Sequence, residues 1–63
     1  MYKNLEKIRK EKKLSTADLA KVINKSAVNY YKKEKGLVSV SVKEAILIAQ
    51  FLNNRIEYLF KEL

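Results

Sequence analysis

The near absence of helix-breaking residues constrains this chain more than any other feature. Its 63 residues include one glycine and no proline. Because glycine and proline are the residues that most often interrupt helices, this composition favours helix nearly throughout. Folding of so short a chain buries only about 60% of its unfolded surface, and there is no cysteine to form a disulfide. The sequence therefore predicts one all-α domain, residues 1–63, a compact bundle of five helices.

Apolar periodicity, capping residues and stop residues divide the chain into the five expected helices. A serine before a helix caps its first turn, and asparagine or glycine after a helix tolerates the left-handed conformation that ends it. The expected helices cover residues 2–12, 16–23, 27–34, 42–52 and 55–62. Their N-terminal signals are Ser15 with Asp18, Ser26, Ser41 with Glu44, and Asn54 with Glu57, and their stops are Asn24, Gly36 and Asn53.

A strand competes with helix only in the segment 37–42. The alternating sequence VSVSV is typical of a β-strand, but the chain has no second candidate strand, and an isolated strand is not stable. We therefore expect residues 37–40 to form a loop. The helix that follows is apolar around most of its circumference, and Val42 and Ile46 are among its apolar residues. This pattern predicts that it is the central buried helix.

Residues 14–36 are expected to form a short helix, a tight turn and a second short helix. Two helices joined so closely must cross steeply, and the second then stands out from the domain. This is the helix-turn-helix arrangement, formed here by the second and third expected helices. The second helix of such a pair enters the major groove of DNA.

The positive charge of the chain is concentrated in the same part of the sequence. Residues 1–36 carry eleven basic and four acidic side chains, whereas residues 37–63 carry three of each, so the whole net charge of +7 belongs to the first segment. Such a distribution indicates a polyanionic partner, nucleic acid before an anionic membrane. A lysine surface that only keeps the protein in solution remains the alternative.

Several function classes have no support in the composition. With no cysteine and no histidine, zinc would have only carboxylates to bind, and no nucleophile–base arrangement can be named. We therefore expect no metal, no cofactor, no small-molecule ligand and no enzymatic activity. No apolar run approaches the roughly 20 residues that span a bilayer. Residues 1–13 lack the apolar stretch of a signal peptide, and the basic half lacks a wide apolar face for a membrane surface. A cytoplasmic protein is expected.

Four motifs follow one another without a gap from Leu5 to Phe60. They are the basic segment LEKIRKEKKLS, the pair Leu19–Ala20 with Asn24 four residues on, Glu34 with Gly36, and Ser41 followed by a helix ending in LIAQFLNNRIEYLF. In this order and register the chain resembles the phage-repressor family of helix-turn-helix proteins, the Cro/XRE type with a lambda-repressor-like DNA-binding domain. The resemblance implies DNA binding and an origin in a phage or another mobile element.

The resemblance also implies structural roles for single residues. Ala20 faces the crossing of the second and third helices, where a larger side chain would push them apart. Tyr30 stands where the family has isoleucine or valine to hold the third helix on the core, and its hydroxyl needs water or another partner. Arg9 and Glu34 match positions that form a structural salt bridge between the first and third helices.

Three positions depart from the family pattern. Thr16 replaces a glutamine that contacts phosphate, Lys33 replaces a hydrophobic residue, and Lys25 replaces the valine after the turn. Both lysines exchange core packing for charge. The exchange either strengthens phosphate contact or changes the orientation in which the third helix packs.

By the same resemblance, the residues that contact bases are Ala27, Val28, Asn29 and Lys32, on the exposed face near the start of the third helix. Asn29 can pair bidentately with adenine, and Lys32 can donate to guanine. The methyl groups of Ala27 and Val28 suit thymine. The alternatives are that Ala27 and Val28 pack against a neighbouring helix and that Asn29 only begins the third helix.

A second set of residues is expected to contact phosphates, which position a protein on DNA without reading its sequence. Free N–H groups at the start of the second helix can donate to a phosphate. Tyr31 either stacks on the sugar-phosphate backbone or packs under the fourth helix. The predicted phosphate contacts are Ser15, Thr16, Lys25, Tyr31, Lys33, Lys35 and Lys43.

One domain of this size reads about half of a site, and proteins of this type place two recognition helices about 34 Å apart. A homodimer on a palindromic operator in double-stranded DNA is therefore expected. The expected dimer surface is the aromatic-rich end of the uncharged half, formed by Phe51, Tyr58, Phe60 and Leu63. The alternative is that these side chains close the core of the monomer.

Two functions are consistent with these predictions. The first is a sequence-specific transcriptional regulator, a Cro-like repressor that acts by occluding a promoter. The second is a protein-interaction module on the same scaffold, such as an antitoxin or inhibitor whose target is a protein. A steep salt dependence on duplex DNA would favour the first, and a partner bound with shallow salt dependence would favour the second.

Overall fold

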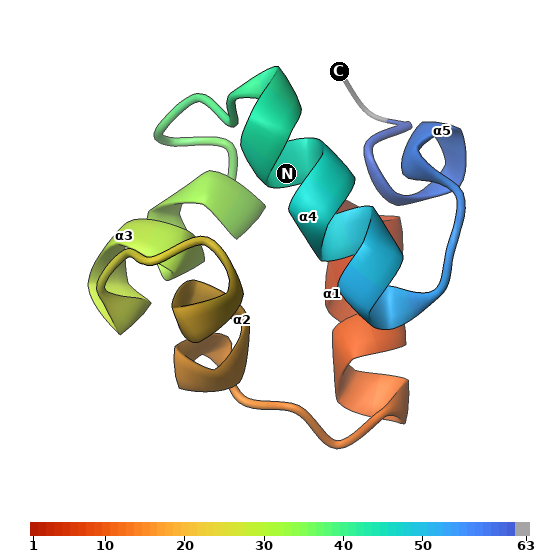
Figure 1. The fold of residues 1–63 in the computed structure, drawn as a ribbon, viewed down its shortest axis with the longest axis horizontal. Coiled ribbons are helices and arrows are strands. Elements are labelled where there is room, and N and C mark those ends of the chain that lie inside the picture. Colours follow the sequence, from red (N-terminus) through yellow and green to blue (C-terminus); the bar gives the residue numbers. More distant parts are fainter. Residues whose placement is uncertain (62–63) are drawn as a thin grey trace.

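Five helices form within residues 1–61, the part of the chain that the computed structural model describes (Figure 1). They are α1 Lys3–Glu11, α2 Thr16–Val22, α3 Ala27–Glu34, α4 Val42–Leu52 and α5 Ile56–Leu59. Helix α2 packs most extensively on α3, α4 contacts α2 and α5, and α1 contacts α5 and α3. In Figure 1, α2 and α3 lie together on one side of α4, and α5 lies on the other. The predicted all-α fold is confirmed.

Side-chain caps determine where three of the helices begin. At α2 the Ser15 hydroxyl accepts a hydrogen bond from the Asp18 N–H at 3.1 Å, while the Asp18 carboxylate accepts one from the Ser15 N–H at 2.8 Å. Ser41 and Glu44 form the same reciprocal pair at α4, and Ser26 caps α3. Each cap pairs an N–H that the helix leaves free and stabilises the fold by about 1 kcal/mol. The predicted caps of these three helices are confirmed.

Residues in the left-handed conformation follow the ends of the helices. Asn24, Gly36 and Asn53 have φ values of 58°, 79° and 54°, as predicted for stop residues. Lys13, between α1 and α2, also has a positive φ of 59°, and nothing in a lysine side chain signals that conformation. At Gly36 the conformation and the space both favour glycine, because a Cβ atom would lie 3.1 Å from the Met1 nitrogen.

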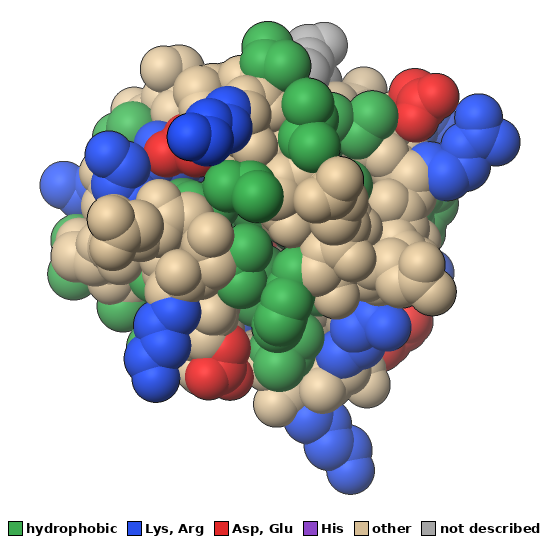
Figure 2. Space-filling model, viewed as in Figure 1, with side chains coloured by type: hydrophobic (Ala, Val, Ile, Leu, Met, Phe, Trp, Pro, Cys, Tyr) green, Lys and Arg blue, Asp and Glu red, His purple; other side chains and the backbone are tan. Residues whose placement is uncertain are grey.

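Side chains from all five helices form one core. The largest apolar side chains that are fully buried are Leu5, Leu19, Tyr30, Ile48, Leu52 and Leu59. Val42 and Ile46, by contrast, are 76% and 44% exposed. As expected of the central helix, α4 supplies Ala45, Ile48, Ala49 and Leu52 to the core, but it is not buried all round, because no element within residues 1–61 covers its outer face. Figure 2 shows hydrophobic side chains at the surface over α4.

The connection between α3 and α4, residues 37–41, is a loop, as expected, and no strand occurs among the described residues. Its alternating sequence places Val38 and Val40 half-buried beside exposed Ser39 and Ser41. Within residues 1–61, no helix is long and apolar enough to cross a membrane.

The last helix is shorter than predicted and begins differently. Arg55 occupies the N-cap position of α5 without a side-chain cap. The predicted cap of Asn54 with Glu57 is wrong, because the Asn54 side-chain amide donates instead to the Leu52 carbonyl at 3.3 Å. The predicted end of this helix, at residue 62, lies outside the described residues.

Candidate nucleic-acid interface

The turn between α2 and α3 holds the two helices in close contact. The Lys25 N–H donates to the Ala20 carbonyl at 3.0 Å, and the Asn24 N–H donates to the Lys21 carbonyl at 3.2 Å. These two bonds, around a left-handed Asn24, form the Schellman motif that ends a helix sharply. Ala20 is 2% exposed, and its small side chain allows α3 to approach α2. The chain thus forms a helix-turn-helix with α3 as its second helix.

The outer face of α3 carries the residues predicted to contact bases. Val28 is 63% exposed and Lys32, one turn later, is also exposed, whereas Ala27 and Asn29 are half-buried. The Oδ1 atom of Asn29 is buried and has no hydrogen-bond partner among the described residues. Val28 and Lys32 are therefore exposed on this face, whereas Ala27 and Asn29 lie at its edge. Their contact with DNA bases stays a prediction.

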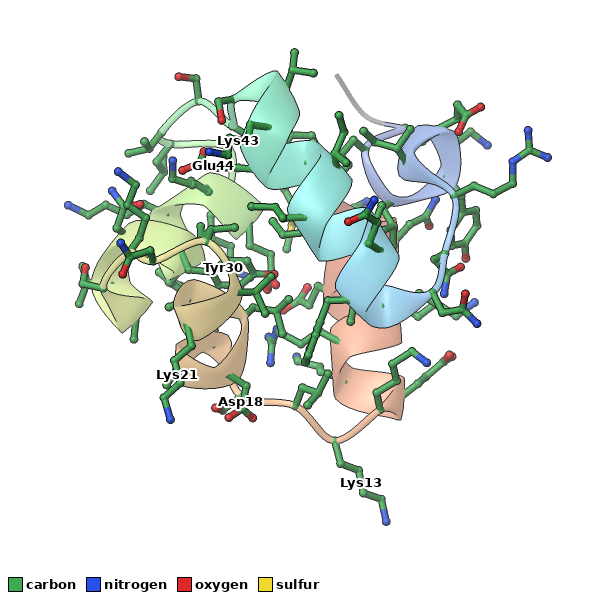
Figure 3. All side chains as sticks on the ribbon, in the orientation of Figure 1. Lys13, Asp18, Lys21, Tyr30, Lys43 and Glu44 are labelled. Carbon is green, nitrogen blue, oxygen red and sulfur yellow. The ribbon has the colours of Figure 1, made fainter. Side chains whose placement is uncertain are left out.

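The inner face of α3 is anchored by a buried hydrogen-bond network. The Tyr30 hydroxyl donates to Glu34 Oε2 at 2.7 Å. Arg9 donates from Nε and Nη2 to the two carboxylate oxygens of Glu34, at 2.9 and 3.1 Å, and from Nη1 to the Leu14 carbonyl at 2.8 Å. Figure 3 shows Tyr30 directed from α3 toward the interior. The predicted Arg9–Glu34 ion pair is confirmed, and Glu34 is the partner that the Tyr30 hydroxyl needs.

The electrostatics of this network keep its two donors, Tyr30 and Arg9, protonated. Burial, together with the hydrogen bond to Glu34, raises the pKa of the Tyr30 hydroxyl far above its ordinary value. The hydrogen bond to Glu34 raises the pKa of the Arg9 guanidinium against the opposing effect of desolvation. Because neither donor loses its proton near neutral pH, the network holds α3 in a fixed orientation relative to α1.

A helix-turn-helix family model matches residues 5–59, which is most of the chain. This chain belongs to the Cro/C1-type (XRE) helix-turn-helix family. The membership confirms the resemblance seen from Leu5 to Phe60 and makes the protein a DNA-binding regulator of the XRE type. No curated protein and no solved structure matches the chain.

Lys33 stands where the XRE-family pattern has an apolar residue, and the structure shows what compensates the charge. Its ammonium lies 2.7 Å from Glu44 Oε1 and 3.3 Å from the Ser39 carbonyl, and the side chain is buried. Figure 3 shows Glu44 at the start of α4, close to α3. A lysine held in this way does not reach a phosphate, so the prediction that Lys33 contacts DNA is corrected: Lys33 joins α3 to α4.

The same Glu44 oxygen also accepts the Ser41 N–H at 3.0 Å, so one carboxylate caps α4 and neutralises Lys33. Burial by itself raises the pKa of Glu44, but the hydrogen bonds from Lys33 and Ser41 outweigh that effect. The net result is a pKa below the ordinary value. Glu44 is therefore charged at neutral pH and balances the buried ammonium.

Lys35 and Tyr31 lie next to each other at the end of α3. Tyr31 is 47% exposed, and the Lys35 ammonium lies 5.5 Å from the centre of its ring. The same ammonium lies 3.2 Å from Glu6 Oε2 on α1. The other predicted phosphate contacts lie at the starts of α2 and α4 and in the turn: half-buried Thr16 and exposed Ser15, Lys25 and Lys43.

The structure changes the predicted dimer surface. Phe60 is 5% exposed and meets the Tyr2 ring edge-on, with 5.1 Å between the ring centres. The prediction for Phe60 is therefore wrong, because this side chain closes the core of the monomer. Phe51 and Tyr58 are 50% and 37% exposed, and Leu63 lies outside the described residues.

The outer face of α4 carries exposed apolar side chains that were not predicted from the sequence. Val42 and Ile46 border two open grooves between α4 and α5, with volumes of about 270 and 550 Å³. Ile56 of α5 lines both grooves. The signal was present in the sequence, since Val42 and Ile46 are four residues apart and share a helix face that Ile48 does not.

Proposed function

We propose that this protein is a sequence-specific repressor of the Cro type that binds double-stranded DNA with α3 in the major groove and occludes a promoter. The observation that carries the proposal is the asymmetry of α3. Its inner face is fixed by the Tyr30–Glu34–Arg9 network, while Val28 and Lys32 are exposed on its outer face. A rigid helix with a free outer face suits the major groove, which is wide enough for one α-helix.

Base recognition would come from the outer face and edge of α3. Lys32 donates to guanine, while Ala27 and Val28 contact thymine methyl groups. Asn29 pairs with adenine after its amide turns outward, which would give the buried Oδ1 atom the hydrogen bond that it lacks among residues 1–61.

Phosphate contacts would surround this helix and contribute affinity that does not depend on sequence. The charge distribution supports them, since residues 1–36 carry the whole net charge of +7. The proposed contacts are Ser15, Thr16, Lys25, Tyr31, Lys35 and Lys43. The three lysines among them neutralise phosphates and predict that log K falls with log salt concentration with a slope of roughly −3.

We further propose that two copies bind a palindromic operator and meet through the α4–α5 face, defined by Val42, Ile46 and Ile56, which border the grooves between these two helices. Val42 and Ile46 are exposed, and Ile56 is half-buried. Phe51 is also exposed but borders a separate groove with Leu14 and Val22. The segment that carries the α4–α5 face, residues 37–63, has no net charge. Two copies that meet there keep their basic halves apart and avoid most of the repulsion between them.

Selection of bound duplexes from a random pool, repeated at two salt concentrations, tests the proposal. The expected result is a palindromic consensus whose half-site centres lie about 34 Å apart. A weaker consensus at low salt than at high salt is also expected, because phosphate contacts dominate at low salt. Recovery of duplexes without any consensus at either concentration would contradict sequence-specific binding.

A second candidate function is supported by the apolar residues around α3. Val28, Tyr31 and Leu37 are 63%, 47% and 73% exposed, which suits a protein target as well as a thymine-rich groove. On this alternative the domain is an antitoxin or inhibitor. A protein partner bound with shallow salt dependence, together with no affinity for any duplex, would favour this function over the first.

A further inference from the structure

An acidic side chain on α1 faces the basic surface at the end of α3. Glu6 Oε2 lies 3.2 Å from Lys35 Nζ and 3.2 Å from Lys10 Nζ. The Lys10 contact is an ordinary pair one helical turn apart. The Lys35 contact joins two elements, and both of its side chains are largely covered, with exposures of 20% for Glu6 and 25% for Lys35.

The contacts of Lys35 resemble those of a lysine bound to DNA. Its ammonium has an anionic oxygen at hydrogen-bond distance and lies 5.5 Å from the centre of the Tyr31 ring, within the range of a cation–π contact. The hydrogen bonds from Lys10 and Lys35 lower the pKa of Glu6, so its carboxylate stays charged at neutral pH. In the free protein, Glu6 therefore occupies the position of an anion beside a proposed phosphate contact.

We propose that Glu6 acts as an internal substitute for a backbone phosphate, holding Lys35 in the free protein and so weakening the binding of every duplex. This inference rests on the proposed DNA-binding function and adds to it a residue outside the helix-turn-helix. When DNA binds, Lys35 must exchange the Glu6 carboxylate for a phosphate oxygen. The net free energy of that phosphate contact is then only the difference between the free energies of two similar charge-assisted hydrogen bonds.

The effect falls on general affinity, because a phosphate contact does not depend on the base sequence. A partly exposed ion pair of this kind contributes little free energy. Removal of the carboxylate should therefore strengthen duplex binding by about two- to fivefold. The gain should be the same for a selected duplex and for a scrambled one. The salt slope should steepen by up to about one unit as Lys35 becomes available.

The test compares Glu6→Gln with Glu11→Gln by titration of a fluorescent duplex at two salt concentrations. Both substitutions remove one negative charge from α1, but Glu11 is exposed and takes part in no ion pair among the described residues. We expect Glu6→Gln to bind more tightly than Glu11→Gln. Equal affinities of the two variants would show that only net charge matters and would overturn the proposal.

Repeating Glu6→Gln in a Lys35→Ala background distinguishes two mechanisms: Glu6 could weaken DNA binding by holding Lys35, or its charge could repel the phosphates directly. If Glu6 acts through Lys35, Glu6→Gln strengthens binding in the wild-type background and has little effect in the Lys35→Ala background. A gain that persists without Lys35 would overturn the proposal, because Glu6 would then act on the phosphates directly.

A measurement without DNA distinguishes failure of this inference from failure of the proposed function. Carbon-13 NMR titration of the side-chain carboxyl should show a higher pKa for Glu6 in Lys35→Ala than in the wild type. An unchanged pKa would overturn the proposal whether or not the protein binds DNA. If the pKa rises but the wild type binds no duplex at low salt, the ion pair exists and the proposed function fails, and the role assigned to Glu6 fails with it.

Discussion

Among single residues, Lys33 shows how a charge can replace an apolar side chain in a small core. An ammonium group that is buried without a partner is penalised by several kcal/mol. Here it has two acceptors, Glu44 Oε1 at 2.7 Å and the Ser39 carbonyl at 3.3 Å. Glu44 is itself fixed by the capping box of α4. The sequence identified that capping box but not the ion pair, because the pair depends on how α3 meets α4.

Lys33→Met should destabilise the fold, because it keeps the volume but leaves the Glu44 carboxylate without its cation. The expected loss of unfolding free energy is about 3 kcal/mol at neutral pH, measured by urea denaturation. Lys32→Met, on the exposed face of the same helix, is the control and should change stability by less than about 0.5 kcal/mol. Adding Glu44→Gln to Lys33→Met should recover part of the loss, since glutamine also forms a capping box. No recovery would contradict the role assigned to the pair.

The stability of the wild type should fall in acid through Glu44. Its pKa is lower in the folded state than its ordinary value of 4.5, so the unfolded state binds the proton more readily. The contribution of the pair is therefore present above about pH 4.5 and is lost as pH falls through the lower, folded pKa. Urea denaturation at neutral pH and near pH 3 should show the difference between wild type and Lys33→Met shrinking in acid. A constant difference would contradict this account.

At the scale of elements, local signals explain what could be predicted. Serine caps and left-handed stop residues act within a few positions of the chain, so the bounds of α3 and α4, and those of α2 to within one residue, followed from the sequence. Features that depend on distant contacts did not follow, such as the exposed outer face of α4 and the left-handed Lys13. The Arg9–Glu34 pair was predicted only through the family resemblance, since no local pattern links residues 25 apart.

Helix α3 should carry sequence discrimination separately from general affinity. Asn29→Ala and Lys32→Ala should each reduce the preference for the selected duplex by about 1–3 kcal/mol relative to a scrambled one. Neither should lower stability much, because Lys32 is exposed and the Asn29 oxygen has no partner within residues 1–61. Lys21→Ala on the outside of α2 (Figure 3) is the control for lost charge. If both α3 variants distinguished the selected duplex from the scrambled one as well as the wild type does, α3 would not be the helix that recognises the base sequence.

At the scale of the whole molecule, the chain has a basic half, residues 1–36, and an electrically neutral half, residues 37–63. The sequence predicted this division and the helix-turn-helix in the basic half. It did not predict which aromatic residues remain exposed, because Phe60 packs on Tyr2 at the other end of the chain. The origin in a phage or mobile element and the cytoplasmic location stay predictions from the sequence.

The neutral half should mediate self-association. Ile46 is 44% exposed and borders a groove against α5, so Ile46→Glu should weaken a dimer by burying charge at the interface without unfolding the monomer. Sedimentation equilibrium without DNA measures the effect. Ala17→Glu, which adds the same charge to an exposed position of α2, should leave the association constant within about twofold. Equal weakening by both substitutions would argue against the α4–α5 face.

The central claim is that the outer face of α3 meets duplex DNA, and mapping of backbone amide NMR signals during titration with a selected duplex tests it most directly. The account predicts the largest shifts at Val28, Asn29 and Lys32, with smaller shifts at Thr16 and Lys43 where phosphates are expected. Shifts confined to α4 and α5, or none at low salt with excess duplex, would contradict it.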